Sequence, residues 1–162
     1  YSKNLQTKEI NLEQIVNYCV EIIINRYSLS NDNFEINLND IMIKTDPTAL
    51  QLVLLNLIDN AVKYSNENIK VIIEAKNNPS GKIDISIKDF GQGIPGPEIS
   101  KIFRRFYRMS NDIAGNKKGT GLGLFIVNET IRNLKGKIEV ISEGKNKGTD
   151  FKITLPKDRD NA

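Results

Sequence analysis

Apolar side chains recur at helical spacing in several stretches of the chain. Between residues 12 and 28 they fall three and four positions apart, which predicts an amphipathic helix with Asn11 as its N-cap. A second helix is expected over residues 46–64, because the Asp-Pro pair at its start supplies a capping carboxylate and a proline suited to the first turn. A third should occupy residues 123–134, and a short helix is expected over residues 97–106.

Between these helices lie short runs that are rich in β-branched residues or alternate between apolar and polar residues, as strands do. Helices and strands mix without strict alternation, so the expected fold class is α+β. The predicted architecture is a two-layer α/β sandwich in which a mixed sheet carries helices on one face. The predicted strands are residues 34–38, 41–44, 69–75, 83–89, 137–142 and 149–155.

Composition narrows the function classes. With 39% hydrophobic and 27% charged residues among 162, the chain is typical of one soluble globular domain. A net charge of +3 gives no argument for nucleic acid, and no apolar run is long enough to span a membrane. Cys19 is the only cysteine, which excludes an internal disulfide. The chain has no histidine, which excludes Ser-His-Asp hydrolases and histidine-ligated zinc within it.

The stretch DFGQGIPG at residues 89–96 matches two known nucleotide motifs, and both fail. A protein-kinase interpretation needs a catalytic-loop histidine, which is absent, and a dinucleotide fold needs a helix where Pro95 and Pro97 interrupt the chain. A carboxylate at the end of a strand, followed by glycines, can instead accept a hydrogen bond from the exocyclic amino group of adenine. The alternative is a solvated Asp89 before an ordinary glycine turn.

Polar residues form one stripe on the largely apolar second helix. Asn56, Asn60 and Lys63 are spaced at i, i+4 and i+7, and an unpartnered buried amide is unfavourable by about 1–3 kcal/mol. Such a stripe indicates a ligand, and an amide oxygen suits Mg²⁺. The alternative is that the stripe is the solvated face of the helix.

A glycine-rich segment, residues 119–124, precedes the third long helix. The first N–H groups of a helix form an anion site, and Arg108, Lys117 and Lys118 add positive charge suited to a polyphosphate. A flexible glycine loop without a ligand is the alternative.

These motifs together resemble the catalytic, ATP-binding domain of sensor histidine kinases, in the superfamily that includes gyrase, Hsp90-type chaperones and mismatch-repair ATPases. The resemblance covers nearly the whole chain from about Ile10. Residues 56–65 resemble the N box, 89–95 the first glycine box, 102–108 the F box, 119–124 the second glycine box, and Gly148-Thr149 the last box.

The resemblance implies the Bergerat ATP-binding fold, with a mostly antiparallel sheet covered by three helices, and the cofactors ATP and Mg²⁺. Residues 107–118 would form a mobile ATP lid that Phe103 and Phe106 anchor. Asn60 would bind Mg²⁺, Asn56 would support the phosphates and catalysis, and Asp89 would read adenine. Arg108 would stabilise charge during phosphoryl transfer. The other nucleotide contacts would be Lys63, Tyr64, Gly91, Gly93, Ile94, Tyr107, Lys118, Gly119, Thr120, Gly121, Leu122, Gly123, Leu124 and Thr149.

Within the superfamily, branches that hydrolyse ATP or phosphorylate serine carry a glutamate base four residues before the metal-binding asparagine. This chain has Asn56 there, and an amide cannot take a proton. The expected function is therefore histidine-kinase phosphotransfer, from Mg-ATP to a histidine on an upstream dimerisation domain and onward to a response-regulator aspartate. A non-catalytic ATP-binding regulatory module of the same fold is the alternative, and a purely structural interaction domain would have no nucleotide affinity.

The expected organisation is a linker or hairpin tail at residues 1–9, the catalytic domain at 10–157 and a short tail at 158–162. Because the acceptor histidine is missing, we expect that the isolated chain cannot phosphorylate itself. We expect it to be a cytoplasmic monomer with no nucleic-acid or membrane contact. The intact protein is expected to be a homodimer anchored behind a membrane sensor.

Overall fold

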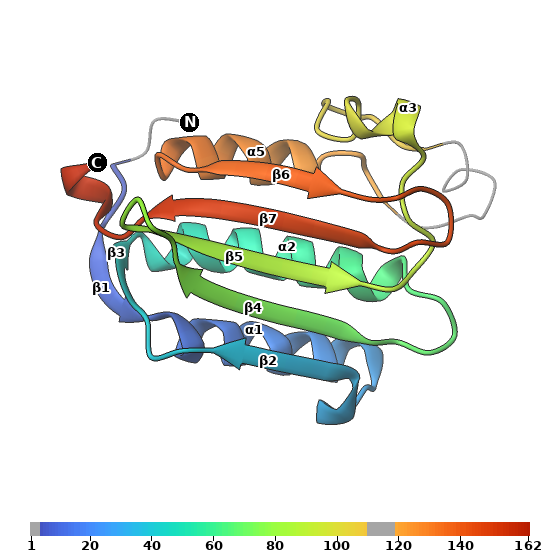
Figure 1. Cartoon of the computed structure of the whole chain (residues 1–162), viewed down its shortest axis with the longest axis horizontal. Coiled ribbons are helices and arrows are strands. Elements are labelled where there is room, and N and C mark those ends of the chain that lie inside the picture. Colours follow the sequence, from blue (N-terminus) through green and yellow to red (C-terminus); the bar gives the residue numbers. More distant parts are fainter. Residues whose placement is uncertain (1–3, 110–118) are drawn as a thin grey trace.

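The computed structural model describes residues 4–109 and 119–162, and within these ranges it has two layers. One layer is a five-stranded sheet, and the helices α1, α2 and α5 lie together behind it (Figure 1). The elements are β1 (Lys8–Asn11), α1 (Leu12–Tyr27), η1 (Asn31–Asn33), β2 (Phe34–Leu38), β3 (Met42–Thr45), α2 (Pro47–Lys63), β4 (Val71–Asn77), β5 (Lys82–Asp89), α3 (Gly96–Ile99), α5 (Gly123–Asn133), β6 (Lys137–Ile141), β7 (Thr149–Pro156) and η2 (Arg159–Asn161).

The sheet has the order β2-β4-β5-β7-β6, and only β2 and β4 pair in parallel. The predicted α+β sandwich with a mixed, mostly antiparallel sheet covered on one face by helices is therefore confirmed. In the central pair, β5 and β7, Asp89 lies opposite Thr149 at the end of the strands. None of the helices in the described ranges combines the length and the apolar character that crossing a membrane requires.

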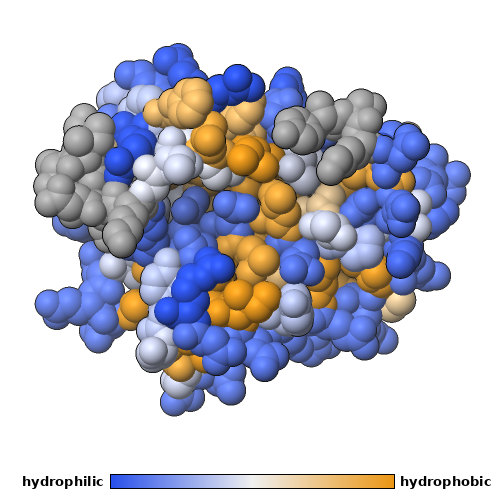
Figure 2. All heavy atoms as spheres, turned by 180° about the vertical axis from the view of Figure 1, so that it is seen from behind, coloured by the Kyte–Doolittle hydropathy of each residue, from blue (hydrophilic) through white to orange (hydrophobic). Residues whose placement is uncertain are grey.

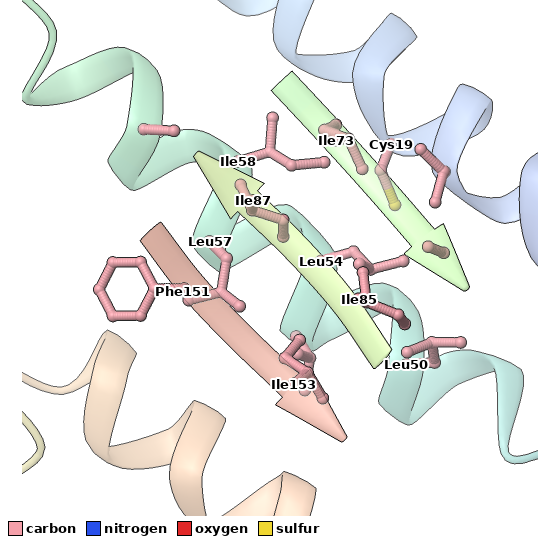
Figure 3. Packing of buried hydrophobic residues seen from close by; sticks show 14 of the residues in the cluster. Cys19, Leu50, Leu54, Leu57, Ile58, Ile73, Ile85, Ile87, Phe151 and Ile153 are labelled. Atoms are coloured by element: carbon pink, nitrogen blue, oxygen red, sulfur yellow. The ribbon is translucent and has the colours of Figure 1, made fainter. Parts of the chain in front are cut away.

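Helix α2 forms the centre of the core. Its side chains Leu54, Leu57 and Ile58 are fully buried and interleave with Ile85 and Ile87 of β5 (Figure 3). Cys19 of α1 packs against the same cluster, and burial raises the pKa of its thiol to about 12. That thiol stays protonated at neutral pH, so Cys19 is a core residue without nucleophilic reactivity.

The two predicted helix caps are present. The Asn11 side chain accepts a hydrogen bond from Glu13 N at 2.9 Å, and Asp46 Oδ1 accepts one from Ala49 N at 2.9 Å. The second cap holds the start of the helix that carries the polar stripe.

The predicted helix over residues 97–106 is wrong in extent, because α3 ends at Ile99. Beyond it the chain makes successive i→i−3 turns, such as Arg104 N to Lys101 O, and Phe106 adopts a left-handed φ of 62° that no α-helix accommodates. Strand β1 is absent from the predicted elements. Residues 8 and 9, expected in the preceding linker, pair with Thr45 and Lys44 of β3.

Candidate functional site

A cavity of about 390 Å³ opens between the C-terminal half of α2, the ends of β5 and β7, and the start of α5. All three predicted motifs contribute to it, although they lie far apart in the sequence. The predicted residues that line it are Asn56, Asn60, Lys63, Tyr64, Asp89, Gly93, Ile94, Tyr107, Arg108, Gly119, Thr120, Gly121, Gly123, Leu124 and Thr149. Gly91 and Leu122 are adjacent in the chain without lining it, and Lys117, Lys118 and lid residues 110–118 lie outside the described residues.

One end of the cavity holds a buried carboxylate. Asp89 is only 4% exposed, which excludes the solvated alternative, and its Oδ1 accepts a hydrogen bond from Gly91 N at 2.9 Å. Burial raises the pKa of Asp89 to about 6, although backbone N–H groups of Gly91 and Thr149 act to lower it. At neutral pH the group is an acceptor in a water-poor site, suited to an amino group of a ligand.

The glycines of this motif differ in what they allow. A side chain at Gly91 would place its Cβ 2.0 Å from the Tyr64 carbonyl oxygen. Only glycine therefore lets the segment that follows β5 lie against the C-terminal end of α2. Gly93 has a φ of +67°, and a Cβ there would lie 2.1 Å from Gly144 O. A Cβ at Gly96 would meet nothing within 4 Å, so that glycine is not required by its surroundings.

The stripe on α2 faces the cavity. Asn56 donates through Nδ2 to Leu52 O at 2.8 Å, and its Oδ1 faces the start of α5, where a Cβ at Gly123 would lie 3.1 Å away. The Lys63 Nζ is similarly close to Gly119, at 3.0 Å from a Cβ built there. The three polar side chains are half-buried and line the cavity, so they are not simply the solvated face of a helix.

The amide oxygens of Asn56 and Asn60 suit a metal ion that is held mainly by the phosphates of a bound ligand. Within residues 4–109 and 119–162 no group of three His, Cys, Asp or Glu side chains is placed to bind an ion. Mg²⁺ differs from metals that need such a group, because it keeps several waters and takes one or two protein oxygens together with phosphates. The Asn60 amide in the middle of the stripe meets that requirement.

Asp59 also lines the cavity, and the sequence interpretation missed it. Its Oδ1 accepts hydrogen bonds from Arg26 Nη1 at 2.9 Å and from the Tyr27 hydroxyl at 2.8 Å, which ties α1 to α2. Burial and the bond to Asp59 raise the pKa of Tyr27 to about 12. The signal was present in the sequence, since Asp59 is three residues after Asn56 and so lies beside the polar stripe.

The second glycine segment is joined to the F-box residues through the backbone. Phe106 N donates to Gly121 O at 2.9 Å, and Gly121 has a φ of +73° with no room for a side chain beside Phe106. The resemblance implies two anchoring phenylalanines. The Phe103 ring packs edge-on against Phe151 at 6.4 Å, whereas the Phe106 side chain is 67% exposed, so Phe106 makes its contact here through its main chain.

The fold and the cavity together define the class of protein. Residues 45–159 match the family described as histidine kinase-, DNA gyrase B- and HSP90-like ATPase, and the chain belongs to this family.

The relatives are sensor histidine kinases. The chain is 39% identical over 159 residues to the sensor protein kinase WalK of Staphylococcus aureus, covering 93% of this chain and 26% of WalK. It is 39% identical over 111 residues to the adaptive-response sensory kinase SasA of Synechococcus elongatus, covering 68% of this chain and 28% of SasA. The chain therefore spans about a quarter of the length of these relatives.

Solved structures with the same fold include histidine kinases. The mycobacterial sensor histidine kinase MprB aligns with a TM-score of 0.81 at 26% identity, over 94% of this chain and 99% of that one. The catalytic domain of the histidine kinase ThkA aligns with a TM-score of 0.79 at 26% identity, over 98% and 100%. Full-length ShkA in complex with AMPPNP aligns with a TM-score of 0.79 at 25% identity, over 96% and 32%.

Proposed function

We propose that the chain is the catalytic domain of a sensor histidine kinase, which binds Mg-ATP and donates its terminal phosphoryl group to a histidine on another domain. The observation that supports this proposal is one cavity that is lined both by a buried carboxylate, Asp89, and by the polar stripe Asn56–Asn60–Lys63 of α2. That arrangement suits a ligand with an amino-bearing base and a polyphosphate. The complex of the structurally similar ShkA with AMPPNP, an ATP analogue, supports the same ligand class.

In this proposal each end of the cavity has its own task. Asp89 accepts a hydrogen bond from the adenine amino group, with Gly93, Ile94 and Thr149 beside it. Asn60 holds Mg²⁺, which when bound neutralises charge on the phosphate oxygens. Asn56 and the segment Gly119–Leu124 at the start of α5 would hold the phosphates, and Arg108 would meet the terminal one. Lys63, Tyr64 and Tyr107 would border the nucleotide. Lys118, which lies outside the described residues, is a nucleotide contact by the family resemblance alone.

Residue 56 selects the reaction. An asparagine cannot remove a proton from water or from a serine hydroxyl, which disfavours ATP hydrolysis and serine phosphorylation. A neutral imidazole nitrogen is already a nucleophile, so a histidine acceptor needs less help from a base. Arg108 is half-buried at the cavity and can stabilise the charge on the phosphoryl group as it moves.

The acceptor must come from outside these 162 residues, because they contain no histidine. A groove between the first half of α2 and α5 offers a docking surface, because its mostly polar lining includes the apolar residues Leu52, Phe125 and Ile126. Leu52 and Ile126 are 38% and 41% exposed, and apolar side chains gather in a band on this helix-bearing face (Figure 2). Leu5 lines the same groove, so a dimerisation domain preceding it would enter beside this surface.

Reconstitution of the transfer tests the proposal. The chain would be mixed with Mg-ATP carrying a labelled γ-phosphate and with a separately expressed dimerisation domain of the same protein. Acid-labile phosphohistidine should form only when both are present, and stable labelling of the chain alone would contradict the proposal. Arg108→Ala should slow transfer more than it weakens ATP binding, whereas Arg104→Ala, at an exposed neighbouring position, should do neither.

The docking surface has its own control. Ile126→Asp should reduce transfer and leave ATP affinity unchanged, because the groove lies outside the cavity. Ile141→Asp introduces the same charge at an exposed position on β6, 49% exposed, and should leave transfer unchanged.

The wider setting is part of the same proposal. The catalytic domain would occupy residues 10–157, between a linker and a short C-terminal tail. In isolation it would be a cytoplasmic monomer, and the intact protein would be a homodimeric, membrane-anchored kinase. A response-regulator aspartate would receive the phosphoryl group. A non-catalytic ATP-binding regulatory module is the second candidate, and it predicts ATP binding without phosphohistidine in the reconstituted mixture.

A further inference from the structure

The turn between β6 and β7, residues 142–148, lies directly against the first glycine motif. Asn146 N donates to Gln92 O at 2.7 Å, and Gly148 N donates to Gly91 O at 3.1 Å. A Cβ at Gly148 would lie 2.3 Å from Asp89 O, so the two backbone segments are in contact. The turn therefore forms the outer support of the wall that contains Asp89.

One side chain links the two segments. The Ser142 hydroxyl donates to Gly148 O at 2.7 Å and accepts from Ile94 N at 3.0 Å, with a longer bond from Gly144 N at 3.4 Å. A hydroxyl has one donor and two acceptor sites, so this one is fully used. Ile94 and Gly148 are buried, which means that water is poorly placed to replace the hydroxyl.

The two groups that Ser142 joins belong to two segments that adjoin Asp89. Ile94 lines the cavity one residue after Gly93, and Gly148 immediately precedes Thr149, the partner of Asp89 across the sheet. The hydroxyl thereby sets the spacing between the glycine wall and the strand that carries Thr149. Ser142 does not itself line the cavity.

We infer that Ser142 is a positioning residue of the base end of the cavity, which holds Ile94 and Thr149 at the spacing that lets Asp89 read an amino-bearing purine. This inference rests on the proposed ATP binding and goes beyond it, because it assigns base discrimination to a residue outside the binding motifs. Without the hydroxyl, Ile94 N and Gly148 O lose their partner, and the wall can relax away from the ligand.

The test compares two ligands on three variants. ATP and the triphosphate of purine riboside, which lacks only the exocyclic amino group, would be titrated by calorimetry. Ser142→Ala should weaken ATP binding about tenfold and weaken the analogue about twofold, because only ATP uses the hydrogen bond that the spacing permits. Ser142→Thr keeps the hydroxyl and should restore the preference for ATP.

Ser86→Ala is the matched control. Ser86 is a half-buried serine on β5 whose hydroxyl donates to Asp150 Oδ1 at 2.6 Å away from the cavity, so its loss should leave both affinities unchanged. If Ser142→Ala weakened the binding of both ligands equally, the role of Ser142 would be merely structural and the inference would be overturned. Unchanged binding, or a threonine variant that fails to restore the ATP preference, would overturn it as well. If the wild-type chain bound no ATP at all, the proposed function would fail first.

Discussion

At one end of the cavity Asp89 and Thr149 are 4% and 7% exposed and face each other across paired strands. At the other end Asn56, Asn60 and Lys63 are half-buried on one helix, beside an exposed Gly119. The first end is built from sheet register and from backbone hydrogen bonds to the carboxylate. The second presents polar groups whose full set of partners includes the phosphates and the metal of the proposed ligand.

The difference in burial indicates that the two groups of residues have different functions in ligand binding. A buried acceptor in a rigid wall distinguishes ligands by the hydrogen bonds they can make, because an unsatisfied buried group is unfavourable. Half-buried amides and a lysine provide charge and coordination that depend on ionic conditions. Substitutions around Asp89 should therefore change folding stability and the choice of ligand. Substitutions along the Asn56–Asn60–Lys63 stripe should change how strongly ligand binding depends on the metal.

Gly91→Ala should have the strongest effect of all the substitutions that separate the two ends. Its Cβ would lie 2.0 Å from Tyr64 O, so the end of α2 must shift, and the free energy of unfolding should fall by about 2–3 kcal/mol. Gly96→Ala, in the same motif with open space around it, should stay within about 0.5 kcal/mol of wild type. Urea denaturation measures both, and equal stability of the two variants would refute the assigned contact.

Asp89→Asn should weaken ATP binding about 30-fold, within the range for loss of a hydrogen bond to a charged group. It should not lower stability at pH 7, because burial of the ionised carboxylate opposes folding, as its raised pKa indicates. Asp84→Asn is the control on the same strand, since Asp84 accepts from Thr154 Oγ1 at 2.9 Å away from the cavity. ATP titration of both variants decides the point, and unchanged affinity in Asp89→Asn would remove the adenine assignment.

Asn60→Ala should weaken Mg-ATP binding about tenfold, the lower end of what loss of a group that supports a metal produces. With a chelator present, its ATP affinity should match that of wild type, because the amide acts through the ion. Asn37→Ala, at an exposed asparagine bonded to Glu35, serves as control. ATP titrations with and without Mg²⁺ show whether the amide acts through the metal. If Asn60→Ala lost the same affinity in both titrations, Asn60 would lie outside the metal site.

A pH dependence is the smallest of these effects. If ATP binds the ionised form of Asp89, whose pKa is about 6, affinity should rise about fourfold from pH 5.5 to pH 7.5. Asp89→Asn retains the titration of the ATP phosphates and should lack this increment. A rise of equal size in the variant would assign the dependence to the ligand.

The contribution of Asp89 to folding stability should change with pH in the opposite direction to ATP affinity. The pKa of Asp89 is raised from 3.8 to about 6 on folding, so the folded state binds more protons between these values. Its contribution to stability is present below about pH 4 and is lost as pH rises through 6. The stability of Asp89→Asn relative to wild type should therefore increase over that range, which denaturation at several pH values measures.

Most elements could be predicted because their signals are local. The apolar spacing of α1, α2 and α5, the caps Asn11 and Asp46, and the alternation in β5 and β7 are all visible in short windows of sequence. Strand β1 could not be predicted in this way, since four residues of mixed polarity become a strand only when β3 supplies a partner. The extent of α3 likewise depends on Phe106 meeting Gly121.

The chemical groups of the site and their order can be read along the chain: a carboxylate ending a strand, an amide stripe on a helix and glycines before another helix. Residue types and periodicity encode these features directly. The folded chain adds which of these groups share a cavity, the burial and raised pKa of Asp89, and the contacts of Asp59 and Ser142 beside the site. Burial, close backbone contact and hydrogen bonds between distant segments exist only after the sheet and helices have packed together.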